Sequence, residues 1–360
     1  MSDLKDIRLK INEIDKEMAK LFEERMKASA EVAEYKKEHA LPIFDSSRET
    51  EVINKNLQYI NDEELKQYYV NFLKSTMDIS KSYQSSLLNG LKVAYSGVKG
   101  AFAYIACQKM FPNATYVSYL SFNDAYKACE KGECDVCVLP LENSYAGEVG
   151  LVMDLMFSGS LYINQVYELE VTHNLIAKKG TSIDKIKKVY SHKQALDQCI
   201  DFINEYKFEI VEAPNTAWAA KYVSEQGDET IAAIASSDTA SIYDLSVLKS
   251  NINVSNINTT RFGAFCRCLN KATSKSDEQC ILVFTVKNEA GALAKTLNII
   301  GSHVFNMRSL RSRPMKELIW NYYFYVEVEG DINSQEGKDM IRALSIFCDK
   351  LKVVGVYNKL

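Results

Sequence analysis

The sequence has few of the features that mark several classes of protein. Only 5 of its 360 residues are proline and 4 are histidine, and no apolar run is long enough to cross a bilayer. Residues 1–18 lack the apolar core of a secretory signal, and a net charge of −4 offers no general attraction to nucleic acid. A hydrophobic share of 47% suits a globular chain with two or three cores. We therefore expect a soluble, cytoplasmic protein with neither a membrane segment nor a nucleic-acid partner.

Cysteine is present, but not in a pattern typical of metal or redox sites. The nine cysteines include one C-x-x-C pair, Cys134 and Cys137, and no second pair that would complete a four-thiolate site. Both lie in the run CDVCVLPL, which predicts a buried strand. We expect buried, reduced thiols there, and neither a metal nor an organic cofactor.

Arginine is scarce, which makes each one informative. Nine of the 43 basic residues are arginines, and none occurs between Arg48 and Arg261. Lysine therefore supplies most of the solvating charge. Because guanidinium groups are always charged and bind carboxylates in a bidentate manner, the few arginines are candidate anion ligands.

Residues 1–88 are predicted to be entirely helical. They contain one proline and no glycine, and apolar residues recur in steps of four and three from Ile7 to Tyr35. This seam predicts a helix that ends near His39, followed by helices from about residue 46 and over about 62–87. A segment of this size cannot cover such a long helix, so we expect two chains to pair here.

The rest of the chain is predicted to form two further domains. Over residues 91–270, short apolar strands alternate with helices, which indicates a parallel α/β architecture in two lobes with a cleft between them. A polar linker at 271–278 follows. Residues 279–360 have the order βαββαβ, which is typical of a ferredoxin-like fold.

One arginine interrupts the apolar seam of the first helix. Arg25 occupies a seam position, where a guanidinium is costly unless an anion meets it. Lys36, 11 residues on, faces the same way at about 16 Å, whereas Arg8 faces elsewhere and could join the site only from a partner chain. The pattern alone permits two interpretations, an anion site or a coiled-coil dimerisation arm.

Residues 4–88 resemble the all-helical chorismate mutase domain of bifunctional enzymes of phenylalanine biosynthesis. The family's motif residues fall on Arg8, Arg25, Lys36, Asp45, Arg48, Glu49, Ser80 and Gln84. The resemblance implies an intertwined dimer in which Arg25 and the partner subunit's Arg8 bind the carboxylates of chorismate. It also implies that Lys36 and Gln84 donate to the ether oxygen. Asp45, Arg48 and Glu49 would order the ring end, with Ser80 as a neutral hydrogen-bonding group.

Three polar blocks of the middle domain are candidates for a ligand site. Glu142–Ser144 and Ser191–Gln194 follow predicted strands, where ligands of open α/β sheets bind, and Asn258–Phe262 contains the first arginine after Arg48. The residues alone are equally compatible with a two-lobed binding module that only senses an anionic acid and does not convert it. A serine hydrolase is disfavoured because no G-x-S-x-G motif exists.

Residues 91–270 resemble prephenate dehydratase. The matching blocks are VAYSGVKGAFAYIA, Glu142–Gly147, His173-x-Leu175, Ser191–Cys199 and Asn258–Phe262. The resemblance implies a two-lobed fold like that of periplasmic binding proteins, and loss of carbon dioxide and water from prephenate. Thr260 would assist departure of the ring hydroxyl and Arg261 would bind a carboxylate. The expected cleft residues are Glu142, Asn143, Ser144, Ser191, Gln194, Thr260 and Arg261.

Residues 279–360 resemble an ACT domain, a small amino-acid-sensing module. Its first motif falls on Gly291, Ala292 and Leu293 at a strand-to-helix turn. Its second motif, E-S-R-P in the family, is Arg311-Ser312-Arg313-Pro314 here, so a basic residue replaces an acidic one. The resemblance implies L-phenylalanine as effector, bound by Gly291–Leu293, Arg311 and Ser312. A purely structural dimerisation module is the alternative.

Together these resemblances predict a multidomain enzyme with domains at 1–88, 91–270 and 279–360. It would convert chorismate to prephenate and prephenate to phenylpyruvate under feedback by phenylalanine, as a homodimer or homotetramer. The alternative is a ligand-sensing regulator with an ACT domain on a helical arm. Such a regulator would need a DNA-binding element, and the sequence contains no helix-turn-helix signature.

Overall fold

The computed structural model describes residues 3–39, 46–254, 258–269, 278–315 and 321–358. The chain divides into two compact units, a helical unit at the N-terminus and a larger unit that contains the rest of the chain apart from residues 113–115. Residues 271–277 of the predicted linker lie outside the described residues. Among the described helices, none has the length and apolar character that a membrane crossing requires.

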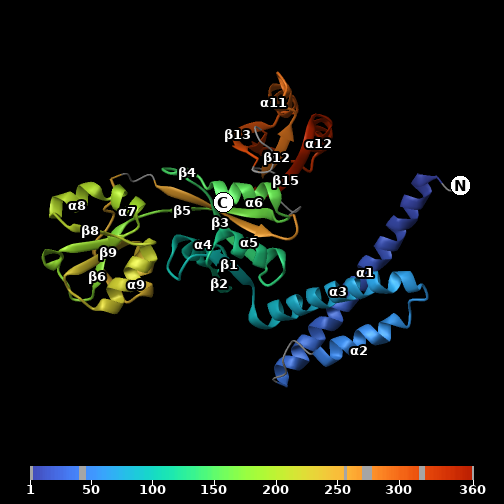
Figure 1. Cartoon of the computed structure of the whole chain (residues 1–360), viewed down its shortest axis with the longest axis horizontal. Helices are drawn as coiled ribbons and strands as arrows, with labels where there is room; N and C mark the ends of the chain where they lie inside the picture. The colour runs from blue at the N-terminus through green and yellow to red at the C-terminus, as the bar shows by residue number, and fades with distance from the viewer. Residues whose placement is uncertain (1–2, 40–45, 255–257, 270–277, 316–320, 359–360) are drawn as a thin grey trace. The chain divides into compact units, whose positions relative to one another are not determined.

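The helical unit consists of three helices, as predicted. They are α1 (Leu4–Glu38), α2 (Ser46–Leu57) and α3 (Glu63–Asn89). Asp62 caps α3 by accepting a hydrogen bond from the backbone N–H of Glu64 (2.9 Å). Helix α3 packs on α1 and α2, but the first half of α1 extends beyond them (Figure 1). Seam residues there, such as Ile7 and Leu21, are consequently 46% and 63% exposed in the single chain.

The first lobe of the larger unit is built on a mixed sheet. Its strands, in spatial order, are β2 (Thr115–Tyr119), β1 (Lys92–Ser96), β3 (Val136–Asn143), β11 (Thr259–Cys266) and β5 (Tyr162–Glu170). Its helices are α4 (Phe102–Met110), α5 (Phe122–Glu130) and α6 (Gly150–Ser158), and the two-residue strand β4 (Gly147–Glu148) pairs with β3. The expectation of a parallel sheet is met by β1 and β3 but is wrong for β11, which returns from the second lobe and pairs antiparallel with both β3 and β5.

The second lobe has a sheet of its own. Its spatial order is β10 (Leu245–Lys249), β6 (Asn174–Lys178), β9 (Ile231–Ala235), β7 (Lys188–Ser191) and β8 (Glu209–Glu212). Around it lie α7 (Lys193–Gln198), α8 (Ile200–Tyr206), α9 (Thr216–Gln226), α10 (Ser237–Ile242) and the 3₁₀ turn η1 (Ile183–Lys185). The chain crosses between the lobes twice. The two crossings lie side by side, since Val171 N–H donates to Asn258 O (2.7 Å).

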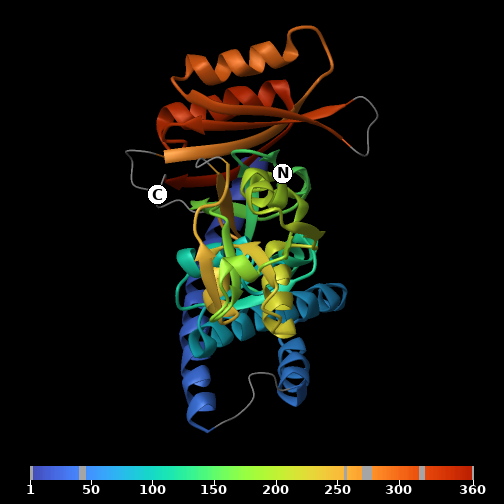
Figure 2. The same ribbon diagram turned by 90° about the vertical axis from the view of Figure 1, so that its left-hand side faces the viewer.

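The C-terminal part has the ferredoxin-like order that the sequence predicts. Its elements are β12 (Glu278–Val286), α11 (Ala292–Ser302), β13 (Asn306–Pro314), β14 (Tyr322–Glu329), α12 (Gln335–Phe347) and β15 (Cys348–Asn358). The strands are antiparallel in the order β13-β14-β12-β15, and both helices lie on one face of the sheet (Figure 2). Strand β15 also pairs with β5 at Gly355 and Ile163, so this sheet continues into the first lobe. A Cβ at Gly355 would lie 2.6 Å from the Ile163 carbonyl oxygen, which is why glycine is required at this junction.

Cys134 and Cys137 are buried, as the apolar run around them predicts. Burial raises the pKa of the Cys137 thiol well above its usual range. Both side chains are therefore part of the hydrophobic core of the first lobe.

Candidate active sites

A polar cluster surrounds Arg25 at the contact between α1 and α3. Arg25 Nη1 donates to the carbonyl oxygen of Thr76 (3.3 Å) and to Ser80 Oγ, and Ser80 Oγ donates to the same carbonyl (2.9 Å). Gln84, one turn further along α3, is 7% exposed, and its Oε1 is buried without a hydrogen-bond partner. Burial lowers the pKa of Arg25, but a guanidinium remains charged at neutral pH. The cluster thus combines a half-buried cation with an amide that lacks one hydrogen bond.

The other predicted residues of the helical unit lie at different places around this cluster. Lys36 is half-buried on α1, and Glu49 of α2 accepts from Lys81 of α3 (2.6 Å). Arg48 is exposed and pairs with Glu51 (2.8 Å). Arg8 is exposed about 25 Å along α1 from Arg25, so it cannot reach the cluster within one chain. Asp45 lies outside the described residues.

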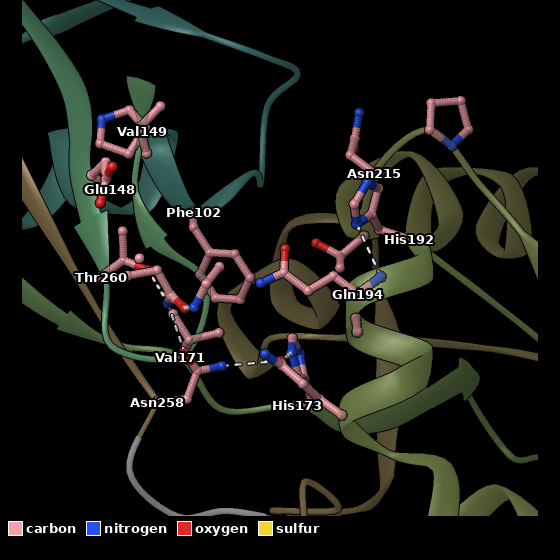
Figure 3. Close-up of a pocket in the computed structure, with 18 of the residues that line it drawn as sticks. Phe102, Glu148, Val149, Val171, His173, His192, Gln194, Asn215, Asn258 and Thr260 are labelled. Atoms are coloured by element: carbon pink, nitrogen blue, oxygen red, sulfur yellow. Dashed lines mark hydrogen bonds between the residues drawn. The ribbon is translucent and has the colours of Figure 1, made fainter. Parts of the chain in front are cut away.

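A cavity of about 420 Å³ lies between the two lobes of the larger unit (Figure 3). Polar side chains from both lobes line it: Asn143, Glu148, His173, His192, Gln194, Gln198, Asn215, Thr216, Asn258 and Thr260. Phe102 and Phe122 add aromatic surface. A cavity of this size with a mostly apolar wall and a few convergent polar groups suits a small organic ligand.

Strand pairing decides which of the predicted residues face this cavity. In the β3–β11 ladder, Thr260 lies opposite Asn143 and Arg261 lies opposite Glu142. Successive side chains of a strand point to opposite faces, so one pair faces the cavity and the other turns away from it. Asn143 and Thr260 line the cavity, as predicted, whereas Glu142 and Arg261 do not.

Arg261 is instead held on the opposite face by acidic residues. It donates to Glu142 (2.7 Å) and to both carboxylate oxygens of Glu327 on β14 (2.6 and 2.9 Å), and Nη2 also donates to the Tyr357 hydroxyl (3.1 Å). The Arg261 side chain is 18% exposed and that of Glu327 is 3% exposed. The predicted carboxylate ligand of the cleft is therefore an anchor between β11 and the C-terminal part.

Two predicted serines also have other partners. Ser144 Oγ accepts from the backbone N–H of Thr259 (3.0 Å), and the fully buried Ser191 Oγ donates to the carbonyl of Ile234 (2.6 Å). Neither serine lines the cavity, because each hydroxyl holds a neighbouring strand. Gln194 does line it, next to His192, which the sequence analysis did not assign.

Hydrogen bonds orient the catalytic candidate Thr260. Asn143 Oδ1 accepts from the backbone N–H groups of Tyr145 (3.0 Å) and Ala146 (2.9 Å), so its other terminal atom is the NH₂ group. That group donates to Thr260 Oγ1 (2.9 Å) and to Asn258 Oδ1 (2.7 Å). Because Thr260 Oγ1 accepts this bond, its own proton remains to be donated.

Three residues that sequence reasoning left without a role share this wall of the cavity: His173, Gln198 and Asn258. Gln198 Oε1 lies 3.0 Å from Asn258 Nδ2 and 2.8 Å from His173 Nε2. All three belong to motif blocks noted above. Only the fold brings these blocks together, so spacing along the chain could not have assigned them.

The predicted effector residues lie in two places in the C-terminal part. Gly291 (φ +80°) precedes α11, and Leu293 packs on the core of this part. Arg311 of β13 points towards Glu142 (3.6 Å) and Glu148 (3.7 Å) of the first lobe, while Ser312 is exposed. No described contact joins Arg311 to the Gly291–Leu293 turn, so the predicted effector set is divided.

Comparisons with known proteins match both units. The family model for chorismate mutase type II matches residues 7–85, and that for prephenate dehydratase matches residues 93–268. A bifunctional chorismate mutase/prephenate dehydratase from Aquifex aeolicus is 32% identical over 370 residues, which covers 100% of this chain and 99% of that protein. The chain belongs to this family of bifunctional enzymes. It is therefore a chorismate mutase and prephenate dehydratase of phenylalanine biosynthesis.

Solved structures resemble the dehydratase and C-terminal parts of the chain. A prephenate dehydratase from Arthrobacter aurescens in complex with L-Phe superposes with a TM-score of 0.69 at 23% identity, over 75% of this chain and 90% of that one. A protein described as GqqA, a novel type of quorum quenching acylase, gives the same TM-score at 27% identity, over 75% of this chain and 98% of that one. These likenesses agree with a shared two-lobed fold.

Proposed function

We propose that chorismate binds at the Arg25 cluster of the helical unit, in a site that a second copy of the chain completes. Arg25 would bind one carboxylate, and Gln84 and Lys36 would donate to the ether oxygen, where negative charge develops. The rearrangement to prephenate is concerted and needs no proton transfer, so a clamp that selects the compact conformer and stabilises that charge suffices. Ser80 orients Arg25 through their hydrogen bond.

The second copy supplies two things that a single chain lacks. Arg8 is about 25 Å from Arg25 along α1, so only another chain can bring it to the cluster. The apolar seam of α1 is exposed from Ile7 to Leu21, and such a stripe is stable in water when it packs against another helix. We infer an antiparallel pairing of two α1 helices that buries both seams and places the partner subunit's Arg8 near Arg25.

We propose that prephenate binds in the cavity between the lobes and loses carbon dioxide and water there. The bond to the ring carboxylate breaks, its electron pair moves into the ring, and the ring hydroxyl leaves as water with a proton taken from solvent. Thr260 would hydrogen-bond to that hydroxyl as it leaves and keep its own proton. The observation that carries this assignment is the hydrogen bond from Asn143 to Thr260 Oγ1, which directs the threonine proton to a new acceptor and strengthens it as a donor.

Both site assignments are tested by abolishing one activity while the other is retained. With chorismate as substrate, the unmodified chain is expected to form prephenate and then phenylpyruvate, and Thr260→Val is expected to stop at prephenate. Val replaces the hydroxyl by a methyl group of similar size, and thermal unfolding checks that lost activity does not come from lost stability. Continued formation of phenylpyruvate by Thr260→Val would refute the role of Thr260. Loss of both activities would contradict two independent sites.

We propose residues 279–360 as a regulatory ACT domain beside a mutase domain at 1–88 and a dehydratase domain at 91–270. Phenylalanine would bind at the turn of Gly291, where the free N–H groups of α11 can receive its carboxylate. A Gly291→Ala variant would strain a backbone at φ +80° without filling the site, because a Cβ there would meet nothing within 4 Å. Calorimetry with L-phenylalanine is expected to show weaker binding by this variant; no binding by the unmodified chain would end the proposal.

A further inference from the structure

We propose that His173 takes up a proton on Nδ1 when prephenate enters the cavity, and that the resulting imidazolium donates to a substrate carboxylate. This inference rests on the proposed dehydratase function of the cavity. It adds a residue to the binding of the substrate and predicts a proton balance for that binding.

The directions of three consecutive hydrogen bonds determine which ring nitrogen is available. Asn143 directs its NH₂ group at Asn258 Oδ1, so the NH₂ group of Asn258 must point at Gln198. Gln198 Oε1 accepts from it and is therefore also the acceptor for His173 Nε2 (2.8 Å). Figure 3 shows Asn258 and His173 on the same wall of the cavity as Thr260.

His173 Nε2 consequently carries a hydrogen in both protonation states, and Nδ1 is where the ring gains or loses a proton. His173 is 2% exposed, and its Nδ1 is buried without a hydrogen-bond partner although the residue lines the cavity. Phe102 covers one side of the ring with an edge-to-face contact at 6.1 Å. Nδ1 is thus a buried ring nitrogen without a partner in a residue that lines the cavity, and an anionic ligand could supply the missing hydrogen bond.

The surroundings of His173 favour its neutral form. Burial lowers the pKa of His173, and the hydrogen bond to Gln198 opposes this only in part. The groups packed around the ring, Phe102, Gln198 and Asn258, are not ionisable, and the backbone N–H of His173 donates to Asn253 (3.0 Å). Among the described lining residues the ionisable ones are His173, His192 and Glu148.

The negative charge of the substrate would favour the protonated form of His173 over the neutral form. Prephenate carries two carboxylates, yet no lysine or arginine is among the described residues that line the cavity, and Glu148 adds a negative charge. A carboxylate close to Nδ1 favours the imidazolium, and the proton comes from solvent water or buffer. His173 would thus supply a cation that the cavity lacks when empty.

Calorimetry measures the proton directly. Prephenate is titrated into the full-length Thr260→Val chain at pH 7.5, because this variant binds the substrate without turning it over. The titration is repeated in buffers that differ in ionisation enthalpy, which gives the number of protons taken up on binding. We expect uptake of about one proton per cleft, and tighter binding as the pH falls. Adding His173→Asn, which keeps an amide donor near the Nδ1 position but cannot titrate, should remove the uptake. Adding His303→Asn, a matched change far from the cavity, should leave it unchanged.

Two outcomes would overturn the proposal. Binding without proton uptake would show that the ring stays neutral, and uptake that disappears with His192→Asn but persists with His173→Asn would assign the proton to His192. If His173→Asn does not fold, ¹⁵N-histidine spectra of Thr260→Val decide the matter. The chain has four histidines, so replacing His39, His192 and His303 in turn assigns the His173 signal by elimination. Its Nδ1 should change from a bare to a protonated nitrogen on binding.

Steady-state kinetics give a readout that a purely structural role would not move. For the unmodified chain, kcat/KM for prephenate should fall by up to about tenfold per pH unit above neutrality while kcat stays constant. In His173→Asn this slope should be absent. Failure of the proposed function is distinguishable, because it would appear as no phenylpyruvate from the unmodified chain at any pH.

Discussion

Replacing Arg261 by methionine tests whether this arginine is an anchor or a substrate ligand. Methionine preserves most of the side-chain length but removes every hydrogen bond to Glu142, Glu327 and Tyr357. The carboxylate of Glu327, with a side chain only 3% exposed, then loses its hydrogen bonds from Arg261 and keeps that from the Tyr357 hydroxyl, while the charge of Arg308 still acts on it. Glu142 is 30% exposed and retains Arg311 nearby, so most of the cost arises at Glu327.

The expected cost is large. Breaking a buried ion pair by removing one partner costs about 3–5 kcal/mol. For a cooperative unit of this size each kcal/mol lowers the melting temperature by about 2–4 °C, so we expect a decrease of roughly 10 °C by scanning calorimetry. The double variant Arg261→Met/Glu327→Gln removes the buried charge as well, and should regain about half of the loss.

Kinetics on prephenate separate the two roles. If Arg261 is an anchor, the double variant, which regains part of the stability, should have a KM at 25 °C close to that of the unmodified chain. As a carboxylate ligand, it should raise KM by tenfold or more in both variants, and Glu327→Gln should bring no relief. An unchanged melting temperature together with the higher KM would refute our reading of the structure and return Arg261 to the substrate.

Three further outcomes follow from the contacts described above. Burial raises the pKa of Glu327, but the hydrogen bonds and charge of Arg261 outweigh burial, so the pKa is lowered overall. The stabilisation that the Arg261–Glu327 pair provides is therefore present above about pH 4.3 and is lost as the pH falls through the lowered pKa. In acid, the free energy of unfolding of Arg261→Met/Glu327→Gln should therefore depend less steeply on pH than that of the unmodified chain. Arg25→Met should lower mutase activity at least 100-fold and leave dehydration of supplied prephenate unchanged, and an equal loss in a Lys20→Met control would contradict the site. Arg311→Glu places a third carboxylate beside Glu142 and Glu148 and should weaken inhibition by phenylalanine about fivefold. The control Arg308→Glu, on the same strand, should not weaken it. Equal effects of the two variants in an inhibition assay would argue against a regulatory role for the contact of Arg311 with Glu142 and Glu148.

Patterns of local origin were predictable from the sequence. Helices α1, α2 and α3 follow from the absence of glycine and from the spacing of apolar residues. The βαββαβ order of the C-terminal part follows from segments in which apolar residues recur with the period of a strand or with that of a helix. Asn143 was also identified, because it lies in a motif that follows a predicted strand, and Thr260 was identified through the resemblance of Asn258–Phe262 to the dehydratase family. These features depend on residues close together in the chain, where propensity and periodicity act.

The direction of side chains could not be obtained in this way. Strand β11 returns from the second lobe to pair with β3, and this register turns Arg261 and Glu142 away from the cavity that Asn143 and Thr260 line. A shift of one residue would have exchanged the two pairs, and no local signal distinguishes the alternatives.

The sequence by itself thus determined the family, the three N-terminal helices and the element order of the C-terminal part. Only the tertiary structure brought His173, Gln198 and Asn258 into one hydrogen-bonded wall, and joined Arg261 to Glu327, 66 residues away. The physical reason is that a hydrogen bond or ion pair between distant segments depends on which strand faces meet in space. Periodicity within a single segment carries no information about that.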